Sequence, residues 1–352
     1  MNKEPLVSVV IVNYNGKIYL KECLESLYTT KYTNFEVIVI DNGSTDGSVE
    51  YIKKSIKKLK LKIIQNDKNI GPSSARNEGI KEAKGKYVVF LDNDTTVTSM
   101  WLKNAVKFLE NNPNVGAGQL KLIISKTNKI DSVGEYIGQN GFLVNIVEAG
   151  KENDNGQYDE IKEIFAAKSA GMIARKDALD EINGFDDDYF IYVEESDLCW
   201  RIWLKGYKVM LIPNSIIYHR FGTSSIILKN DINYFVKFHG AKNYVQTLIK
   251  NLEFKNLIKI LTIHIFLWFG IATFLFSKRK FKSSKWIILG LVWNLTNLKR
   301  ILEKRRRIQK NRVVSDSEIL PKIIKKREIS YFLNKLKGTK KIGNARGWVK
   351  DE

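Results

Sequence analysis

The sequence predicts an α/β protein with a mostly parallel central sheet, followed by a basic, helical C-terminal region. Short apolar runs rich in Val and Ile alternate with amphipathic segments over the first half of the chain. Polar residues gather where those runs end. The charges then separate the last third: residues 1–225 carry 29 Lys and Arg against 30 Asp and Glu, whereas residues 226–352 carry 29 against 8.

Each strand is expected from an apolar run, and each helix from the amphipathic segment beside it. The expected strands are Leu6–Asn13, Glu36–Asp41, Leu61–Gln65 and Tyr87–Leu91. The expected helices lie near Ile18–Tyr28, Ser48–Leu59, Ser73–Lys84 and Ser99–Asn111. Strands that are apolar throughout are typical of a parallel sheet with helices on both faces.

The sequence after residue 114 is less regular than the part before it. Glycines break residues 115–171 into short apolar pieces, and we expect a sheet edge and pocket-forming loops there. Helices are expected at Ala178–Ile182 and Glu194–Lys205, because glycine closes each of them. A last strand, Lys208–Ile212, is expected to stop at Pro213.

The segment YVVFLDND, residues 87–94, ends a buried strand in two carboxylates one residue apart. Alternate residues of a strand share a face, so Asp92 and Asp94 should project to the same side. Ligands of open α/β sheets bind outside the carboxyl ends of the strands, and carboxylates there suit Mg²⁺ or Mn²⁺ with a phosphate-bearing substrate. The alternative is that both acids cap the helix expected from Ser99. His219, after a later apolar run, is either structural or a third metal ligand.

The first two expected strands end in turn sequences where a nucleotide would lie. Asn13 and Asn15 belong to the turn NYNG, and Asp41 begins the turn DNGS. Asp41 could accept hydrogen bonds from a base or a ribose, although these residue types are also common in ordinary turns. Arg76, on the first turns of a helix facing the same cleft, is a candidate phosphate ligand. Alternatively, Arg76 is a surface residue that pairs with a nearby acid.

An acidic segment, GFDDDYFIYVEESDLCWR, covers residues 184–201. Glu194, Glu195 and Asp197 lie at an expected helix start, where the helix macrodipole favours acids. Arg201 could pair with Asp197 at i,i+4. Because the apolar residues of this helix would face the core, Glu195 is left free to point elsewhere. A carboxylate held near an acceptor hydroxyl can act as a general base, and Glu195 is the candidate.

These motifs, in this order, resemble the family 2 glycosyltransferases of GT-A fold. The matching pieces are VSVVIVNYNG, VIVIDNGSTDGS, ARNEGIKEAKGKYVVFLDND, and GFDDDYFIYVEESDLCWRIWLKGYKV followed by YHRFGTS, over roughly residues 5–225. The resemblance implies a nucleotide-diphosphate sugar donor, a divalent metal and an inverting transfer to an acceptor hydroxyl.

On this resemblance, Asp41 would contact the nucleoside, and Asp92 and Asp94 would form the DXD motif. Asp94 would ligate the metal that bridges the two phosphates. Many relatives have Asp after the first Glu of the acidic motif, where this chain has Glu195. We expect Glu195 to be the base and keep Asp197 as the second candidate. The competing class is a non-catalytic, membrane-bound scaffold; a Rossmann dehydrogenase is disfavoured because the first strand is not followed by GxGxxG.

The domain organisation follows from the charge and the apolar segments. We expect a GT-A catalytic domain over residues 1–225, a membrane-associating helical region over 226–300 and a basic tail over 301–352. Cys23 and Cys199 are far apart within apolar helical patterns, which indicates buried thiols in a reducing compartment. Nucleic-acid binding by the tail is disfavoured, because its aromatic residues are too sparse for a stacking platform.

Leu257–Phe276 is long enough to span a bilayer core. A crossing would place the basic loop SKRKFKSSK outside, against the positive-inside tendency, and Trp286–Leu298 is too short to return easily. We therefore expect a monotopic hairpin on the cytoplasmic face of the membrane, with basic residues on anionic headgroups and a lipid-linked saccharide or polyprenyl phosphate as acceptor. One or two true spans, or a helical pair buried against the catalytic domain, are the alternatives.

Overall fold

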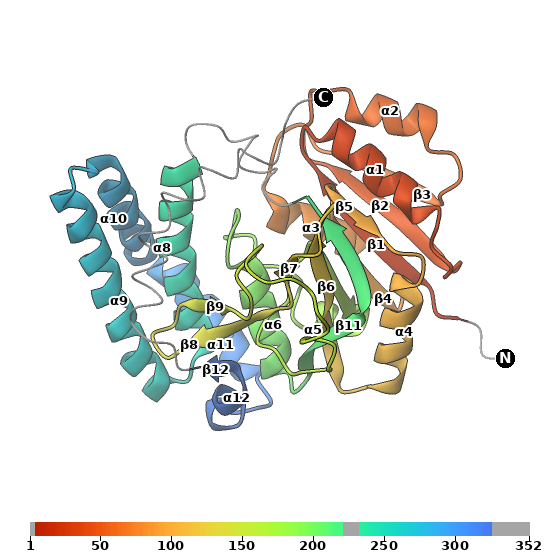
Figure 1. Cartoon of the computed structure of the whole chain (residues 1–352). Helices are drawn as coiled ribbons and strands as arrows, with labels where there is room; N and C mark the ends of the chain where they lie inside the picture. Colours follow the sequence, from red (N-terminus) through yellow and green to blue (C-terminus); the bar gives the residue numbers. More distant parts are fainter. Residues whose placement is uncertain (1–3, 221–231, 326–352) are drawn as a thin grey trace.

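The computed structural model describes residues 4–220 and 232–325. A large sheet with flanking helices occupies one side of the molecule, and a group of long helices stands beside it (Figure 1). The predicted tail beyond residue 325 lies outside the described residues, as does the FGTS part of the YHRFGTS motif.

The strands are β1 (Val7–Asn13), β2 (Phe35–Asp41), β3 (Leu61–Gln65), β4 (Tyr87–Asp92), β5 (Thr95–Val97), β6 (Val115–Ile124), β7 (Ile130–Ser132), β8 (Glu135–Gly138), β9 (Leu143–Asn145), β10 (Gly171–Arg175), β11 (Lys208–His219) and β12 (Ile324–Lys325). The helices are α1 (Lys17–Leu27), α2 (Ser48–Ser55), α3 (Pro72–Glu82), α4 (Trp101–Asn111), α5 (Lys176–Glu181), α6 (Glu194–Leu204), α8 (Ile232–Asn251), α9 (Phe254–Ser277), α10 (Phe281–Thr296), α11 (Leu298–Lys310) and α12 (Asp316–Ile323).

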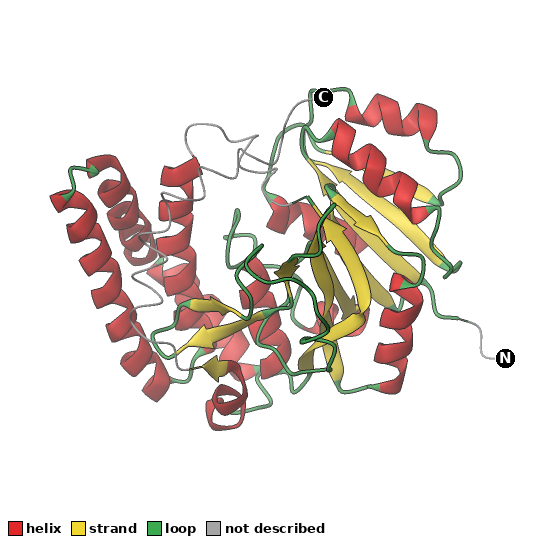
Figure 2. Ribbon diagram, viewed as in Figure 1, coloured by secondary structure: helices red, strands yellow, loops and turns green. Residues whose placement is uncertain are grey.

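The main sheet has the strand order β3-β2-β1-β4-β10-β6-β11-β5, with β7 paired to β6. The strands β3, β2, β1 and β4 run parallel, as expected from the sequence. The strand β10 is antiparallel to both of its neighbours. A second sheet, of strands β12, β8 and β9, lies between the main sheet and the long helices (Figure 2).

Helices cover both faces of the main sheet. Alternate residues of β1 serve opposite faces: Val9 and Ile11 pack with buried residues of α1, α2 and α4, whereas Val10 packs with α3, α5 and α6. Because β1, β2 and β4 are parallel, their carboxyl ends meet at one edge. Asn13 is opposite Asp41 in the register, and Val12 is opposite Asp92. The polar ends of these strands are therefore neighbours.

The expectation of a sheet edge and loops from residue 115 onward is wrong for β6. This ten-residue strand lies inside the sheet, between β10 and β11, and nine of its residues are buried. The glycines of β6 do not interrupt the strand but allow close packing: a Cβ on Gly118 would lie 2.4 Å from Cδ1 of Ile212. The small residues of β6 thus let neighbouring side chains approach.

The expected stop at Pro213 is also wrong, because β11 continues to His219. Ile212 pairs with Leu120 and Ile216 pairs with Lys121, so the strand bulges between them. Proline has no N–H to donate to a ladder and is tolerated at such a bulge. The continuation matters because it carries His219 to the polar edge of the sheet.

The C-terminal helices form one packed group beside the small sheet. Buried side chains of α8, α9, α10 and α11 share a core that includes Trp268, Ile287 and Ile301. The helix α8 also lies against α6 of the main domain. Part of the segment expected as a basic tail is therefore helical and packed, since α11 and α12 follow residue 297.

Candidate active site

The turns after β1 and β2 form one hydrogen-bonded unit. The amide of Asn13 donates to Asp41 Oδ1 (2.9 Å) and to Ser44 Oγ (3.1 Å). The backbone of Asn15 donates to Ser44 Oγ, and its side-chain oxygen accepts from Thr45 N (2.8 Å). Asn13 and Asp41 are both buried. The structure thus brings together three of the predicted nucleotide ligands at the carboxyl ends of β1 and β2.

A second cluster joins Asp92, Asp94 and His219. One ligand atom from each lies within 4.8 Å of the others, so a single ion could be reached by all three. His219 Nε2 is 3.3 Å from Asp94 Oδ1, and His219 Nδ1 is 2.6 Å from Asp131 Oδ2. Two carboxylates and an imidazole fit Mg²⁺ or Mn²⁺. The carboxylate of Asp131 behind the imidazole is a partner that metal-ligating histidines commonly have.

Burial and neighbouring charges shift the pKa values of this cluster in opposing directions. Burial raises the pKa of Asp92, and Asp94 adds to this effect, whereas Arg76 opposes it. Burial alone would lower the pKa of His219, but hydrogen bonds to Asp131 and Asp94 raise it well above its usual range. The alternative in which Asp92 and Asp94 cap a helix does not occur, because α4 begins at Trp101 without a side-chain cap.

The acidic helix α6 exposes one residue to the site. Every residue of α6 except Glu195 is buried, because the helix lies between the main sheet and α8. The carboxylate of Glu195 accepts hydrogen bonds from the backbone N–H of Ser169 (2.8 Å) and from its hydroxyl. These two donors hold one oxygen of Glu195 in place. Glu195 is therefore the α6 carboxylate that is least buried, and its orientation is fixed by Ser169.

Asp197 has a structural environment. It forms ion pairs with Arg201 (2.8 Å) and Lys250 (2.9 Å), and it accepts a hydrogen bond from Asn251 (2.9 Å). Burial alone would raise the pKa of Asp197, but Lys250 and Arg201 hold it below its usual range. The i,i+4 pair with Arg201 is therefore present. Asp197 is surrounded by partners that keep it ionised and away from solvent.

Arg76 connects the two acidic motifs. Its guanidinium forms ion pairs with Asp92 (3.3 Å) and Glu194 (3.1 Å). Arg76 is buried, so the alternative of a surface residue is wrong, whereas the pairing with a nearby acid that belonged to it is present. Burial, with a contribution from Glu195, raises the pKa of Glu194 to about 8. The structure places Arg76 in the site as a bridge between carboxylates.

Three residues of this site were not anticipated from the sequence. Asp131 lies on the short strand β7, Ser169 lies just before β10, and Lys250 lies on α8. Each reaches its partner across a long chain separation: 88 residues from Asp131 to His219 and 26 from Ser169 to Glu195. No local pattern marks Asp131 or Ser169. Lys250 belongs to a polar repeat on α8 that is visible in the sequence.

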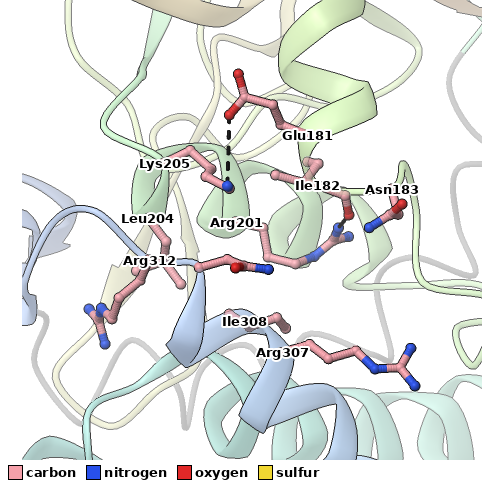
Figure 3. A pocket seen from close by; sticks show the side chains of 10 residues that line it. Glu181, Ile182, Asn183, Arg201, Leu204, Lys205, Arg307, Ile308 and Arg312 are labelled. Carbon is pink, nitrogen blue, oxygen red and sulfur yellow. Dashed lines mark hydrogen bonds and ion pairs between the residues drawn. The ribbon is translucent and has the colours of Figure 1, made fainter.

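A separate pocket lies at the other end of α6. It encloses about 370 Å³ of space, part of it open to solvent, and side chains of α5, α6 and α11 line it (Figure 3). Two of its cations have acidic partners: Lys205 is 3.8 Å from Glu181, and Arg312 is 2.7 Å from Asp316. This pocket contains none of the predicted site residues.

The fold is of the mixed α/β, GT-A-like class. Staphylococcus aureus TarS 1–349, solved in complex with UDP-GlcNAc, aligns with 87% of this chain and 83% of its own at a TM-score of 0.52 and 21% identity. The mannosyltransferase PcManGT of Pyrobaculum calidifontis, solved with GDP-Man and Mn²⁺, aligns over 88% of both chains at a TM-score of 0.52 and 18% identity. At these identities the likeness shows the fold alone.

Residues 8–182 match the family described as Glycosyl transferase family 2. This match covers just under half of the chain, and it lies where the motifs indicated a glycosyltransferase family 2 domain. An uncharacterized glycosyltransferase of Haemophilus influenzae is 38% identical over 109 residues, which make up 31% of this chain. This chain spans 44% and 40% of the length of the first two curated relatives that it matches.

Proposed function

We propose that this protein is an inverting glycosyltransferase that moves a sugar from a nucleotide-diphosphate sugar to an acceptor hydroxyl. The observation that carries the proposal is the arrangement of two acidic groups around Arg76: Asp92, with Asp94 and His219, on one side, and the α6 acids on the other. The family 2 domain supports it. The solved neighbours that hold UDP-GlcNAc or GDP-Man with Mn²⁺ favour the same class of donor.

Each part of the site has a role in this proposal. Asn13, Asn15 and Asp41 bind the nucleoside at the ends of β1 and β2. Asp92, Asp94 and His219 would hold a divalent ion, which would supply positive charge to the leaving diphosphate. Arg76 keeps Asp92 oriented through their ion pair.

Glu195 removes the proton of the acceptor hydroxyl as that oxygen attacks the anomeric carbon. Ser169 holds the carboxylate by two hydrogen bonds, which leaves the second carboxylate oxygen for the acceptor. A base opposite the leaving group permits a single in-line displacement, which inverts the anomeric configuration. No covalent intermediate with the protein is needed.

A screen of UDP- and GDP-sugars tests the proposal. The full chain is incubated with each donor and Mn²⁺ or Mg²⁺, and release of nucleotide diphosphate is measured with and without EDTA. We expect at least one donor to be consumed in a chelator-sensitive manner. If the folded protein consumes none of them with either metal, the non-catalytic scaffold becomes the better account.

The substitution Asp131→Ala is expected to weaken Mn²⁺ binding about 10- to 100-fold, because partners behind a ligating histidine orient it and raise its basicity. Mn²⁺ affinity is measured by calorimetry or by the EPR signal of the free ion, without any turnover. Asp159→Ala is the matched control, since Asp159 pairs with Lys121 outside the cluster. Equal affinity of Asp131→Ala and the wild type would contradict the role of Asp131.

The proposal includes a membrane surface and a lipid-linked acceptor. The helix α9 is long and apolar enough to cross a membrane, and only 22% of its most apolar window is buried. Exposed apolar side chains continue from α9 onto α10, with Phe266 72% and Leu295 71% exposed. The turn between these helices and the start of α10 carry exposed basic residues, namely Lys278, Arg279 and Lys280 in the turn and Lys282 and Lys285 on α10. An apolar hairpin with a basic tip suits the anionic cytoplasmic leaflet in a monotopic arrangement.

We expect the double substitution Phe266→Glu, Leu295→Glu to lower binding to anionic vesicles at least tenfold. Burial of one such side chain is worth about 1.5–3 kcal/mol, and a factor of ten corresponds to about 1.4 kcal/mol. Vesicle flotation with phosphatidylglycerol measures the bound fraction. Ile161→Glu is the control, because Ile161 is 51% exposed on a loop of the main domain. Unchanged flotation of the double variant would contradict this surface.

The topology is tested by Lys282→Cys, since the two native cysteines are buried. A membrane-impermeant maleimide should label Cys at position 282 in inverted vesicles and leave it unlabelled in intact cells. Labelling from outside would overturn the monotopic hairpin in favour of a spanning helix.

A further inference from the structure

The turn that leads into α6 has an unusual backbone. Tyr192 and Val193 have φ angles of 69° and 68°, both in the left-handed region. Val193 is the N-cap residue of α6, directly before Glu194 and Glu195. A β-branched residue such as Val193 seldom adopts this conformation, which is strained for residues other than glycine. Such a turn persists only where surrounding groups hold it.

Asn243, on α8, holds this turn. Its side-chain amide donates to the carbonyl oxygens of Ile191 (2.9 Å) and Tyr192 (2.7 Å). Asn243 is fully buried. The amide of Gln246 donates to the side-chain oxygen of Asn243 (3.0 Å), which fixes the end of the amide that faces the turn. The two carbonyls that the strained turn leaves outside any helix thus find their donor on a distant element.

Asn243 belongs to a buried polar stripe along α8. The stripe repeats every four residues and consists of Lys242, Asn243, Gln246, Thr247, Lys250 and Asn251. Buried polar groups are costly unless they are paired. The partners of this stripe lie in the acidic segment: Lys242 donates to the carbonyl oxygen of Asp188, and Thr247 is 2.6 Å from the hydroxyl of Tyr189. The stripe therefore faces the loop that precedes Glu195.

The helix α11 adds cations to the same loop. Lys304 forms ion pairs with Asp186 and with Asp188 (2.6 Å), and Arg300 Nε donates to Asp188 (2.9 Å). Lys250 also pairs with Asp186. Burial alone would raise the pKa of Asp186, but Lys250 and Lys304 hold it well below its usual range. The loop is therefore anchored at several points to helices from beyond residue 231.

We propose that α8 is part of the catalytic apparatus and that Asn243 is the positioning residue that sets the direction of Glu195. The inference rests on the proposed transfer reaction. Asn243 contacts the turn and none of the proposed nucleotide or metal ligands. Its loss would let Tyr192 and Val193 relax toward ordinary angles and rotate the start of α6. A misplacement of about 1 Å can cost on the order of 10²-fold in rate.

The test compares donor turnover by the full chain and its variants. Asn243→Ala is expected to lower kcat about 10- to 100-fold, with the KM for the donor changed less than about threefold. Gln246→Leu keeps Asn243 but removes the donor that orients it, and should change kcat in the same direction by a smaller factor. Asn294→Ala is the control: Asn294 is buried on α10 and donates to the Gly290 carbonyl of its own helix, so both parameters should stay at wild-type values.

A rescue variant separates positioning from simple loss of stability. Glycine adopts a left-handed conformation without strain, so adding Val193→Gly to Asn243→Ala should raise kcat at least threefold over Asn243→Ala alone. Wild-type kcat in both Asn243→Ala and Gln246→Leu, or no recovery with Val193→Gly, would overturn the proposal.

Hydrogen exchange gives a readout that does not depend on turnover. Backbone amides of residues 191–196 should exchange faster in Asn243→Ala than in the wild type, and those of α4 should not change. An inactive wild type would count against the proposed transfer reaction, and the exchange data would still decide whether Asn243 holds the turn. Equal exchange in the two proteins would show that it does not.

Discussion

Asp94→Ala is expected to lower transfer by about 10²-fold or more, because the site loses a carboxylate from the cluster that would hold the divalent ion. The leaving diphosphate then lacks part of its charge compensation. Mn²⁺ affinity should fall in the same variant. Turnover of the donor and Mn²⁺ binding are measured side by side, with circular dichroism as the test of folding.

Asp180→Ala is the matched control for this substitution. Asp180 is exposed on α5, pairs with Lys176 (2.6 Å) and lies outside both acidic motifs. Its turnover should equal that of the wild type. Near-normal turnover in folded Asp94→Ala would remove Asp94 from the proposed metal site.

Glu195→Gln is expected to lower turnover about 10²–10⁴-fold while donor and metal binding are retained. The glutamine oxygen can still accept the hydrogen bonds of Ser169, so the local geometry is kept and only the proton-accepting carboxylate is lost. Turnover and donor affinity are measured separately, the latter by titration with nucleotide diphosphate.

Asp197→Asn should behave differently, because Asp197 is buried between Arg201 and Lys250. Removing one partner of a buried ion pair typically costs about 3–5 kcal/mol, so this variant should lose stability first. Wild-type turnover in Glu195→Gln would assign the base elsewhere, and Asp197 would then be the next candidate to test.

The regular first half of the fold could be predicted from the sequence because its signals are local. The residues VIVI within EVIVID and the strand before Asp92 are apolar throughout, which is typical of buried parallel strands. The strand β6 could not be placed, because its neighbour β10 comes some fifty residues later and inserts between β4 and β6. The bulge at Pro213 depends on the pairing of β11 with β6. The sequence alone therefore predicts that the strand ends at this proline.

Some residues of the candidate site could likewise be predicted from local sequence patterns, and others could not. Asp92 and Asp94 stand out because they follow the apolar run of a buried strand: Asp92 is the last residue of β4 and Asp94 lies in the next turn. Their meeting with His219 follows once β11 extends past Pro213. Asp131 and Ser169 act through partners that only tertiary structure brings near. The polar repeat on α8 can be recognised in the sequence AKNYVQTLIKN, but its partners on the acidic loop cannot be identified from the sequence.

The measurement that tests the central claim most directly is the configuration of the sugar first released from the donor. Proton NMR follows consumption of the accepted nucleotide-sugar by the full chain with Mn²⁺, before the free sugar mutarotates. A single displacement assisted by Glu195 predicts the anomer opposite to that of the donor, and no release by Glu195→Gln on the same timescale. Release of the same anomer as in the donor would require a different mechanism and would contradict this account.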